Sequence, residues 1–228
     1  MFNDRGEKGF FNTIDSILAA DDFKGKMISL AARPGMGKTT LMLDIIAKNA
    51  LCIRKKILLF SCELKKHYVE KKLSDAVGGD FDNHLEIQVF DKERQSVSGV
   101  EKIIARYDNV GIVFIDSIEK VKGFSSRNAR DTLQRLKNIC EQKNITIILT
   151  CGMNRNEQWK LNDIPKLENI NSEIVDACDV VLAHHRYPYS ADRDNRISEV
   201  HILKNSFGSS QVLPIIFGGS RSFYNGLN

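Results

Sequence analysis

Apolar and polar residues follow one another along this chain in two kinds of block. Short and mainly apolar runs, typical of strands buried on both faces, occupy residues 27–31, 57–61, 110–115 and 145–150. Longer stretches with an apolar residue every three or four positions, typical of one buried helix face, occupy residues 41–50, 68–77, 100–107 and 129–140. A run over 85–89 alternates apolar and polar residues, as a half-buried strand does. Together these patterns predict an α/β fold, with a mostly parallel twisted sheet and helices on both of its faces.

The last third of the chain has a different pattern, in which apolar runs follow one another without helices between them. These runs occupy residues 180–182, 200–203 and 212–217. We expect them to form antiparallel strands that extend one edge of the sheet as hairpins. Near the start of the chain, apolar residues over 10–18 predict one short helix. We therefore divide the chain into a short N-terminal segment, 1–25, that packs on a single α/β domain, 26–228.

The sequence Ala-Arg-Pro-Gly-Met-Gly-Lys-Thr-Thr stands between the first predicted strand and the first predicted helix. This is the context of a phosphate-binding P-loop, in which the amide groups of a helix N-terminus bind phosphate and glycines let the backbone curl around it. We expect Lys38 to reach the β- and γ-phosphates of ATP and the Thr39 hydroxyl to bind Mg²⁺. The alternative is a structural turn that enters a helix. The predicted nucleotide-binding residues are Ala32, Arg33, Pro34, Gly35, Met36, Gly37, Lys38, Thr39 and Thr40.

Two acidic residues follow predicted strands and are candidates for the chemistry of ATP hydrolysis. Asp116 ends the apolar run 110–115, the position of a Walker B aspartate that holds Mg²⁺. Glu63 follows the run 57–61. Because the carboxyl ends of parallel strands meet at one edge of a sheet, Glu63 is expected near the phosphates, as the base toward the attacking water. The alternatives are a helix-capping aspartate and an ordinary surface glutamate.

Composition and charge add limits to this picture. The chain has 228 residues, of which 42% are hydrophobic and 27% charged, and a net charge of +4, which permits a nucleic-acid partner without arguing for one. No apolar run approaches membrane-spanning length and residues 1–8 lack the apolar core of a signal peptide, so we expect a cytoplasmic protein without a membrane partner. The five cysteines show no CxxC spacing and indicate reduced thiols rather than zinc ligands. We expect His184 and His185 to lie at a strand end, on opposite faces.

Six segments of the sequence resemble, in order, the motif blocks of DnaB-type replicative helicases. The segments are 31–39, 60–64, 113–116, 153–155, 162–164 and 174–181. In that family, as here, an alanine replaces the first glycine of the P-loop. The resemblance implies a RecA-like P-loop ATPase domain that forms hexameric rings around single-stranded DNA and uses ATP to translocate 5′ to 3′. It implies ATP and Mg²⁺ as cofactors.

The sequence departs from the family pattern at positions that act between subunits or sense the nucleotide. Cys151 or Gly152 stands where the family has a glutamine that senses the γ-phosphate, and Ser206 stands at the position of the arginine finger. Lys204 matches a basic residue of the family and is a candidate to act on a neighbouring subunit. Candidates to replace the finger are Arg193, Arg196 and Arg221. The 228 residues contain no counterpart of the family's N-terminal domain and linker helix.

Two polar stretches, 120–127 and 155–166, are candidates to bind single-stranded DNA. Lysine and arginine side chains in such loops hold phosphates without reading sequence, and aromatic rings stack on bases. The candidate residues are Lys120, Lys122, Arg127, Arg155 and Lys160 for phosphates, and Phe124 and Trp159 for bases. Solvated loops are an equal alternative for both stretches.

The sequence therefore supports two functions of different classes. The first is an ATP-driven helicase domain acting on single-stranded DNA in replication. The second is a nucleotide-binding accessory protein of the same fold, with weak or no helicase activity, that serves as a regulatory or interaction module. A recombinase-type relative is a third interpretation, which the order of the later segments fits less well.

Overall fold

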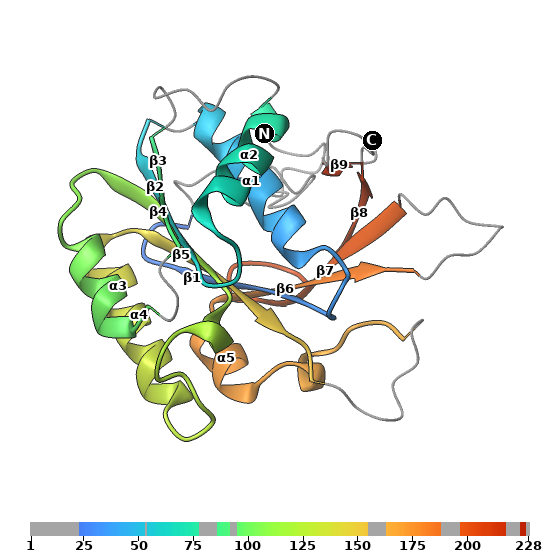
Figure 1. Ribbon diagram of the computed structural model, residues 1–228. Helices are drawn as coiled ribbons and strands as arrows, with labels where there is room; N and C mark the ends of the chain where they lie inside the picture. The colour runs from blue at the N-terminus through green and yellow to red at the C-terminus, as the bar shows by residue number, and fades with distance from the viewer. Residues whose placement is uncertain are drawn as a thin grey trace.

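A mixed β-sheet runs through the part of the chain that the structure, a computed structural model, describes. Those residues are 23–52, 54–77, 86–91, 95–154, 163–187, 197–217 and 224–226. Within them the sheet has nine strands in the order β3-β2-β4-β5-β1-β6-β7-β8-β9 (Figure 1). The strands are β1 (Met27–Ala32), β2 (Lys56–Ser61), β3 (Ile87–Phe90), β4 (Val110–Asp116), β5 (Thr146–Gly152), β6 (Val180–Arg186), β7 (Ile197–Asn205), β8 (Val212–Phe217) and β9 (Tyr224–Gly226).

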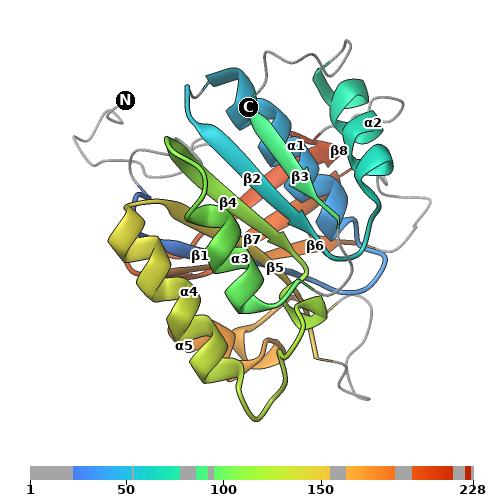
Figure 2. The same cartoon turned by 60° about the vertical axis from the view of Figure 1, so that its left-hand side comes forward.

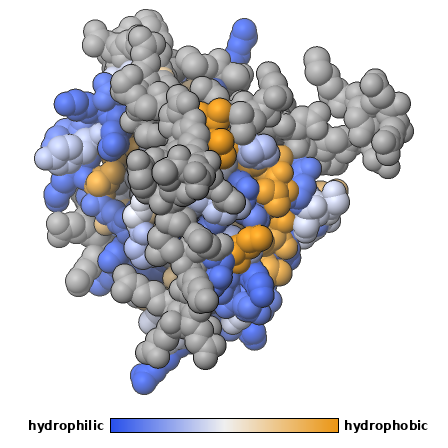
Figure 3. Space-filling model, turned by 90° about the vertical axis from the view of Figure 1, so that its right-hand side faces the viewer, coloured by the Kyte–Doolittle hydropathy of each residue, from blue (hydrophilic) through white to orange (hydrophobic). Residues whose placement is uncertain are grey.

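Strand direction divides the sheet into two parts. The pairs from β3 to β6 are all parallel, whereas β7, β8 and β9 each pair antiparallel with the preceding strand. The fold class predicted from the sequence is therefore confirmed, including the antiparallel strands at the C-terminal edge. On that side of the molecule, hydrophobic side chains reach the surface among hydrophilic ones (Figure 3), and Val212 of β8 is 50% exposed.

Helices cover both faces of the parallel part of the sheet. They are α1 (Lys38–Cys52), α2 (Lys66–Val77), α3 (Val97–Ile104), α4 (Ala129–Lys143) and α5 (Ser172–Ala177), with short 3₁₀ turns η2 (Ile118–Lys120) and η3 (Leu167–Asn169). Helices α1 and α2 pack on one face, and α3, α4 and α5 on the other (Figures 1 and 2). Because every residue of β1 is buried, this strand lies between two apolar layers, as its continuous apolar sequence predicts.

Local signals in the sequence set several helix ends. The Ser96 hydroxyl accepts a hydrogen bond from the Gly99 amide at the start of α3, and the Asn171 side chain accepts one from the Glu173 amide at the start of α5. Asn144 ends α4 in the left-handed conformation with φ 51°, which asparagine tolerates better than most residues. The helix predicted over 10–18 lies outside the described residues.

The parallel register aligns the strand ends that carry the candidate site. Ser61 at the end of β2 lies opposite Asp116 of β4, and Ala32 at the end of β1 lies opposite Gly152 of β5. The residues that follow these positions therefore meet at one edge of the sheet, as expected for a parallel sheet.

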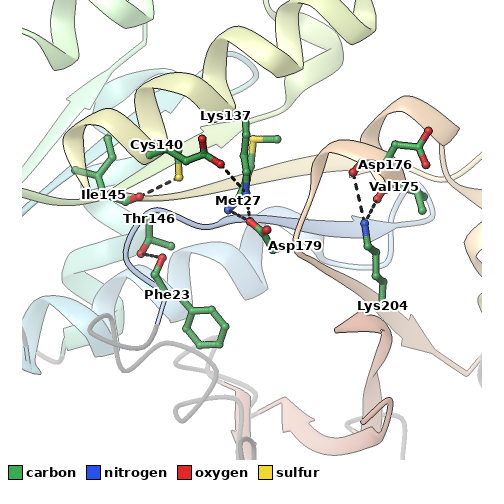
Figure 4. Close-up of polar contacts among 11 residues, drawn as sticks. Phe23, Met27, Lys137, Cys140, Ile145, Thr146, Val175, Asp176, Asp179 and Lys204 are labelled. Carbon is green, nitrogen blue, oxygen red and sulfur yellow. Dashed lines mark hydrogen bonds and ion pairs between the residues drawn. The ribbon is translucent and has the colours of Figure 1, made fainter. Parts of the chain in front are cut away.

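Polar contacts connect several elements at the opposite end of the parallel strands, where β1 begins (Figure 4). One carboxylate oxygen of Asp179, just before β6, accepts a hydrogen bond from the Met27 amide at 2.8 Å. The same oxygen forms a short contact with the ammonium group of Lys137 in α4. Nearby, the Thr146 hydroxyl donates to the Phe23 carbonyl at 2.8 Å. These contacts join the starts of β1, β5 and β6 to α4.

His184 and His185 lie inside β6, which extends four residues beyond the predicted run 180–182. Both residues are buried, with 0% and 1% of their surfaces exposed. They point to opposite faces, as expected, because successive strand residues alternate. Burial, together with the charges of Arg186 and His185, lowers the pKa of His184 to about 3. His184 is therefore neutral in the folded protein at any pH well above that value.

We expect the buried His184 to make the protein less stable in mild acid. The unfolded chain binds a proton at this histidine below pH of about 6.5, whereas the folded chain does not, so acidification favours unfolding. At about pH 5, this difference removes about 2 kcal/mol of the free energy of unfolding. Chemical denaturation of the wild type and His184→Leu should show that the difference between their free energies of unfolding shifts by this amount between neutral pH and pH of about 5. His67→Gln, at an exposed position in α2, is the control; a shift of equal size there would contradict the assignment.

Candidate active site

The predicted phosphate loop connects the end of β1 to the start of α1. Gly35 and Gly37 have φ angles of 78° and 88°, a left-handed conformation that glycine adopts without steric cost. No atom lies within 4 Å of a Cβ built on Gly35, so the backbone conformation, and not crowding, favours glycine there. The loop closes with a hydrogen bond from the Met36 amide to the Arg33 carbonyl. Helix α1 begins directly at Lys38, so its first amides face the end of the loop.

A cavity of about 630 Å³ lies against this loop. Every predicted nucleotide-binding residue lines it except Met36. The opposite wall comes from other strands and turns, and consists of Glu63, Ser117, Glu119, Lys120 and Gly152. The structure thus brings Glu63, predicted from the end of a different strand, to the same cavity as Lys38 and Thr39.

Asp116 lies at the centre of the hydrogen-bonding network of the site. One carboxylate oxygen accepts from the Thr39 hydroxyl at 3.0 Å, and the other accepts from the Thr150 hydroxyl at 2.6 Å. Burial raises the pKa of Asp116 and the negative charge of Glu63 adds to the rise; the Thr150 hydrogen bond, the charge of Lys38 and the Thr39 hydrogen bond oppose it. Asp116 is therefore a desolvated carboxylate whose ionised form a bound cation would stabilise.

The oxygen atoms at this point suit Mg²⁺. Mg²⁺ prefers oxygen ligands and commonly takes only one or two from the protein, with phosphates and water completing its shell. The Thr39 hydroxyl and the Asp116 carboxylate are such ligands, and they are already joined by a hydrogen bond. No group of three or more metal-ligating side chains occurs among the described residues, so a cation here would depend on the phosphates of a nucleotide.

Glu63 is held near Asp116 by contacts at the ends of β2 and β4. The Cys62 amide donates to the Asp116 carbonyl at 2.5 Å. The Ser117 hydroxyl lies 3.4 Å from a carboxylate oxygen of Glu63, to which it donates a long hydrogen bond. Burial, and after it the negative charges of Asp116 and Glu63, raises the pKa of the Cys62 thiol to about 11. The thiol is therefore neutral and unsuited to nucleophilic chemistry.

Sequence reasoning missed three residues of the site: Ser117, Glu119 and Thr150. Thr150 belongs to a strand that reads as buried throughout, and only the structure shows that its hydroxyl reaches Asp116. Glu119 lies in the turn η2, which carries no periodic signal in the sequence. Its carboxylate accepts a hydrogen bond from the Gly152 amide at 2.6 Å. The one available signal was an acidic residue three positions after Asp116.

The candidate DNA-binding residues are only partly described. Lys120 and Lys122 are exposed and line a second cavity, of about 550 Å³, that shares Glu63, Glu119 and Lys120 with the first. Arg127 is exposed. Phe124 packs partly against the core, which makes it less available for stacking than the sequence indicated. Arg155, Trp159 and Lys160 lie outside the described residues.

Lys204 lies near the end of the sheet where β1 and β6 begin, away from the phosphate loop of its own chain. Its ammonium group donates to the Val175 carbonyl at 2.7 Å and lies 3.5 Å from the Asp176 carbonyl, at the end of α5 (Figure 4). Any action on a neighbouring subunit would require Lys204 to exchange these contacts. Ser206, at the predicted finger position, is exposed in the turn after β7. Arg193, Arg196 and Arg221 lie outside the described residues.

Comparison with known proteins agrees with this geometry. A family model described as an AAA domain matches residues 11–158, more than half of the chain. The chain belongs to this AAA domain family. Membership in this family implies a domain that binds a nucleotide. In the described part of this AAA domain, no helix is long and apolar enough to cross a membrane.

Several curated relatives of this AAA domain are replication or repair proteins. A "Probable plasmid replicative DNA helicase" of Chlamydia muridarum (strain MoPn / Nigg) is 24% identical over 217 residues, covering 81% of this chain and 47% of the relative. The "DNA repair protein RadA" of Aquifex aeolicus (strain VF5) is 25% identical, covering 90% and 43%. The "Replicative DNA helicase DnaB" of Helicobacter pylori (strain ATCC 700392 / 26695) is 24% identical, covering 78% and 43%. The chain spans about half the length of these relatives.

Solved structures confirm a RecA-like fold of the DnaB type. One of them, described as an ATPase domain, superposes with a TM-score of 0.78 at 20% identity, covering 90% of this chain and 86% of the other. A DnaB-like replicative helicase, solved in a study of its interactions with primase, superposes with a TM-score of 0.76 at 21% identity, covering 90% and 58%. The resemblance inferred from the sequence motifs is thereby confirmed at the level of the domain.

We expect Thr150→Val to weaken the binding of Mg²⁺ at this site without disturbing the fold. Valine preserves the buried shape but removes the hydroxyl that donates to Asp116, so the ionised carboxylate loses a hydrogen bond worth about 1.5–3 kcal/mol. The Mg²⁺ concentration for half-maximal nucleotide binding should rise about tenfold. The loss should deepen as the pH falls, because the pKa of Asp116, already raised by burial, rises further. Thr150→Ser keeps the hydroxyl and should behave as wild type; an equal loss in the serine variant would show that packing, and not the hydrogen bond, matters.

Proposed function

We propose that this chain is the ATPase domain of a DnaB-like helicase, which binds and hydrolyses ATP and acts on single-stranded DNA in replication with 5′ to 3′ polarity. The observation that supports it most directly is the convergence of Lys38, Thr39, Glu63 and Asp116 at one site, with Asp116 bonded to Thr39. The DnaB-type fold and the replicative helicases among the relatives support the same proposal.

The roles of the residues follow from their positions. The phosphate loop binds the phosphate chain through its backbone amides, and Lys38 pairs with the β- and γ-phosphates. Thr39 and Asp116 hold Mg²⁺, which when bound neutralises charge on the phosphates. Glu63 orients the attacking water and accepts its proton, while Ser117 holds the Glu63 carboxylate in place. A P-loop ATPase gains most of its rate from such positioning and charge stabilisation.

The partners of the domain belong to the same proposal. Single-stranded DNA phosphates are bound by Lys120, Lys122 and Arg127, together with Arg155 and Lys160 of the following stretch. The exposure of Lys120 and Lys122, which line a cavity next to that of the phosphate loop, supports this assignment, because a DNA phosphate could reach both ammonium groups. The domain assembles as a homo-oligomer, a hexamer by its resemblance to the family. Lys204 then faces the nucleotide of the neighbouring subunit.

Two substitutions test the active site. Lys38→Ala should abolish Mg²⁺-dependent ATP turnover, with a loss of about 100-fold or more, because it removes the positive charge at the phosphates. Glu63→Gln should lower turnover by about 100- to 10,000-fold while nucleotide binding persists, because an amide cannot accept the proton of the water. Turnover is followed by phosphate release and binding by a fluorescent nucleotide. Unchanged turnover in Lys38→Ala would remove the assignment of the whole site; unchanged turnover in Glu63→Gln would remove only the base.

The helicase function is tested by DNA stimulation and assembly. We expect single-stranded DNA to accelerate ATP turnover and the protein to sediment as a ring-sized species with nucleotide and Mg²⁺. Lys120→Gln combined with Lys122→Gln should weaken DNA binding about uniformly across sequences and lower its salt dependence, because both side chains contact phosphates. A monomer whose ATP turnover ignores DNA would instead support the accessory function, for which Ser206 in place of an arginine finger is the motivating observation.

A further inference from the structure

Glu119 places an exposed acidic side chain against the backbone at the end of a central strand. It lies in η2, three residues after Asp116, and its Oε1 accepts a hydrogen bond from the Gly152 amide at 2.6 Å. Gly152 is the last residue of β5. A Cβ built on Gly152 would lie 3.6 Å from the same oxygen, so the carboxylate lies directly over this backbone. A hydrogen bond from an amide to an ionised carboxylate is stronger than one to a neutral oxygen.

The same carboxylate belongs to the wall of the nucleotide cavity. Glu119, Gly152 and Glu63 line that cavity opposite Lys38 and Thr39. Glu119 and Glu63 also line the neighbouring cavity. Two carboxylates therefore line the same cavity as Lys38 and Thr39, so the terminal phosphate of a bound triphosphate would bring more negative charge into their surroundings than a diphosphate does.

Backbone pairing and hydrogen bonds connect Gly152 and the residues after it to the start of the phosphate loop. It pairs with Ala32 in the parallel ladder of β1 and β5. The next residue, Met153, donates its amide to the Ala32 carbonyl at 3.2 Å, and Asn154 donates to the Asn169 carbonyl at 2.7 Å. A change at the Gly152 amide therefore affects a short segment, 152–154, that is hydrogen-bonded both to the first residue of the phosphate loop and to the turn η3.

We propose that Glu119 is a positioning and specificity-determining residue that distinguishes nucleoside triphosphates from diphosphates and reports the difference to the end of β5. With a diphosphate bound, the Glu119 carboxylate keeps its contact with the Gly152 amide. The terminal phosphate of a triphosphate repels the carboxylate, which moves away and releases that amide. This inference rests on the proposed nucleotide binding, and adds to it a residue that responds to the number of phosphates.

Variants that separate charge from contact test the proposal. Glu119→Gln keeps an oxygen that accepts from Gly152 but has no charge, and Glu119→Ala removes both. Glu141→Gln neutralises an exposed carboxylate on α4 and is the matched control for net charge. The probes are ADP and a non-hydrolysable ATP analogue, each with Mg²⁺. Their dissociation constants are measured by fluorescence, and amide hydrogen exchange is followed in the peptide that contains Gly152.

The expected results differ between the two readouts. Removing the charge in Glu119→Gln should tighten the triphosphate by about three- to tenfold and the diphosphate by less than about twofold, since Coulomb repulsion falls with distance and is screened by an effective dielectric constant of about 20 or more. In the wild type, the Gly152 amide should exchange faster with the triphosphate than with the diphosphate. In Glu119→Gln it should be protected equally with both nucleotides, and in Glu119→Ala it should exchange rapidly with both.

Specific outcomes would overturn the proposal. Equal tightening of both nucleotides in Glu119→Gln, or the same change in Glu141→Gln, would show a general charge effect and no discrimination. Equal Gly152 exchange with both nucleotides in the wild type would show that the contact does not respond to the terminal phosphate. If the wild type bound neither nucleotide, the proposed function would fail and this inference with it. If the wild type binds nucleotide and Lys38→Ala abolishes that binding, the proposed function stands, and a negative result then concerns Glu119 alone.

Discussion

The buried carboxylate of Asp116 is the group on which the rest of the site depends. It connects the first turn of α1, through Thr39, to the interior of β5, through Thr150. Burying a carboxylate in an apolar layer costs free energy unless hydrogen bonds or a cation compensate. Two hydroxyl donors compensate in part, and the raised pKa of Asp116 shows that compensation is incomplete. A cation shared with nucleotide phosphates would complete the compensation, and binding of the proposed nucleotide would then relieve part of this cost.

The sheet makes this arrangement possible because its parallel register brings several strand ends to one edge. Glu63, Asp116 and Gly152 follow or end three different strands, yet all line or border one cavity. The opposite edge is fixed by Asp179, which joins the start of β1 to α4 through the Met27 amide and Lys137. The contacts that join β1 to α4 therefore lie at one end of the parallel strands, and the residues proposed to act on a nucleotide lie at the other.

The sequence predicted the parts of the molecule whose signal is local. Continuous apolar runs predicted the central strands, and the residues around Lys38 predicted the phosphate loop, because both depend on neighbouring positions in the chain. Asp116 and Glu63 were found because each ends or follows a strand. Thr150 and Glu119 were missed because their roles come from contacts across the sheet: Thr150 reads as an ordinary buried strand residue, and Glu119 lies in a turn without periodicity. His184 and His185, expected at a strand end, are the fifth and sixth of the seven residues of β6; their burial could not be predicted, because it depends on packing from both faces of the sheet.

The residues proposed to act within one subunit and those proposed to act on a neighbour lie in different parts of the sheet. All residues proposed to bind and cleave ATP in this chain lie on or after the parallel strands β1, β2 and β4. Lys204 and Ser206, the positions proposed to face a neighbour in a ring, lie on or just after the antiparallel strand β7, in the other part of the sheet. In its own chain, Lys204 caps the carbonyl end of α5. Ser206 therefore lies outside the network around Asp116, so a difference from the family at this position need not alter the residues proposed to bind the nucleotide.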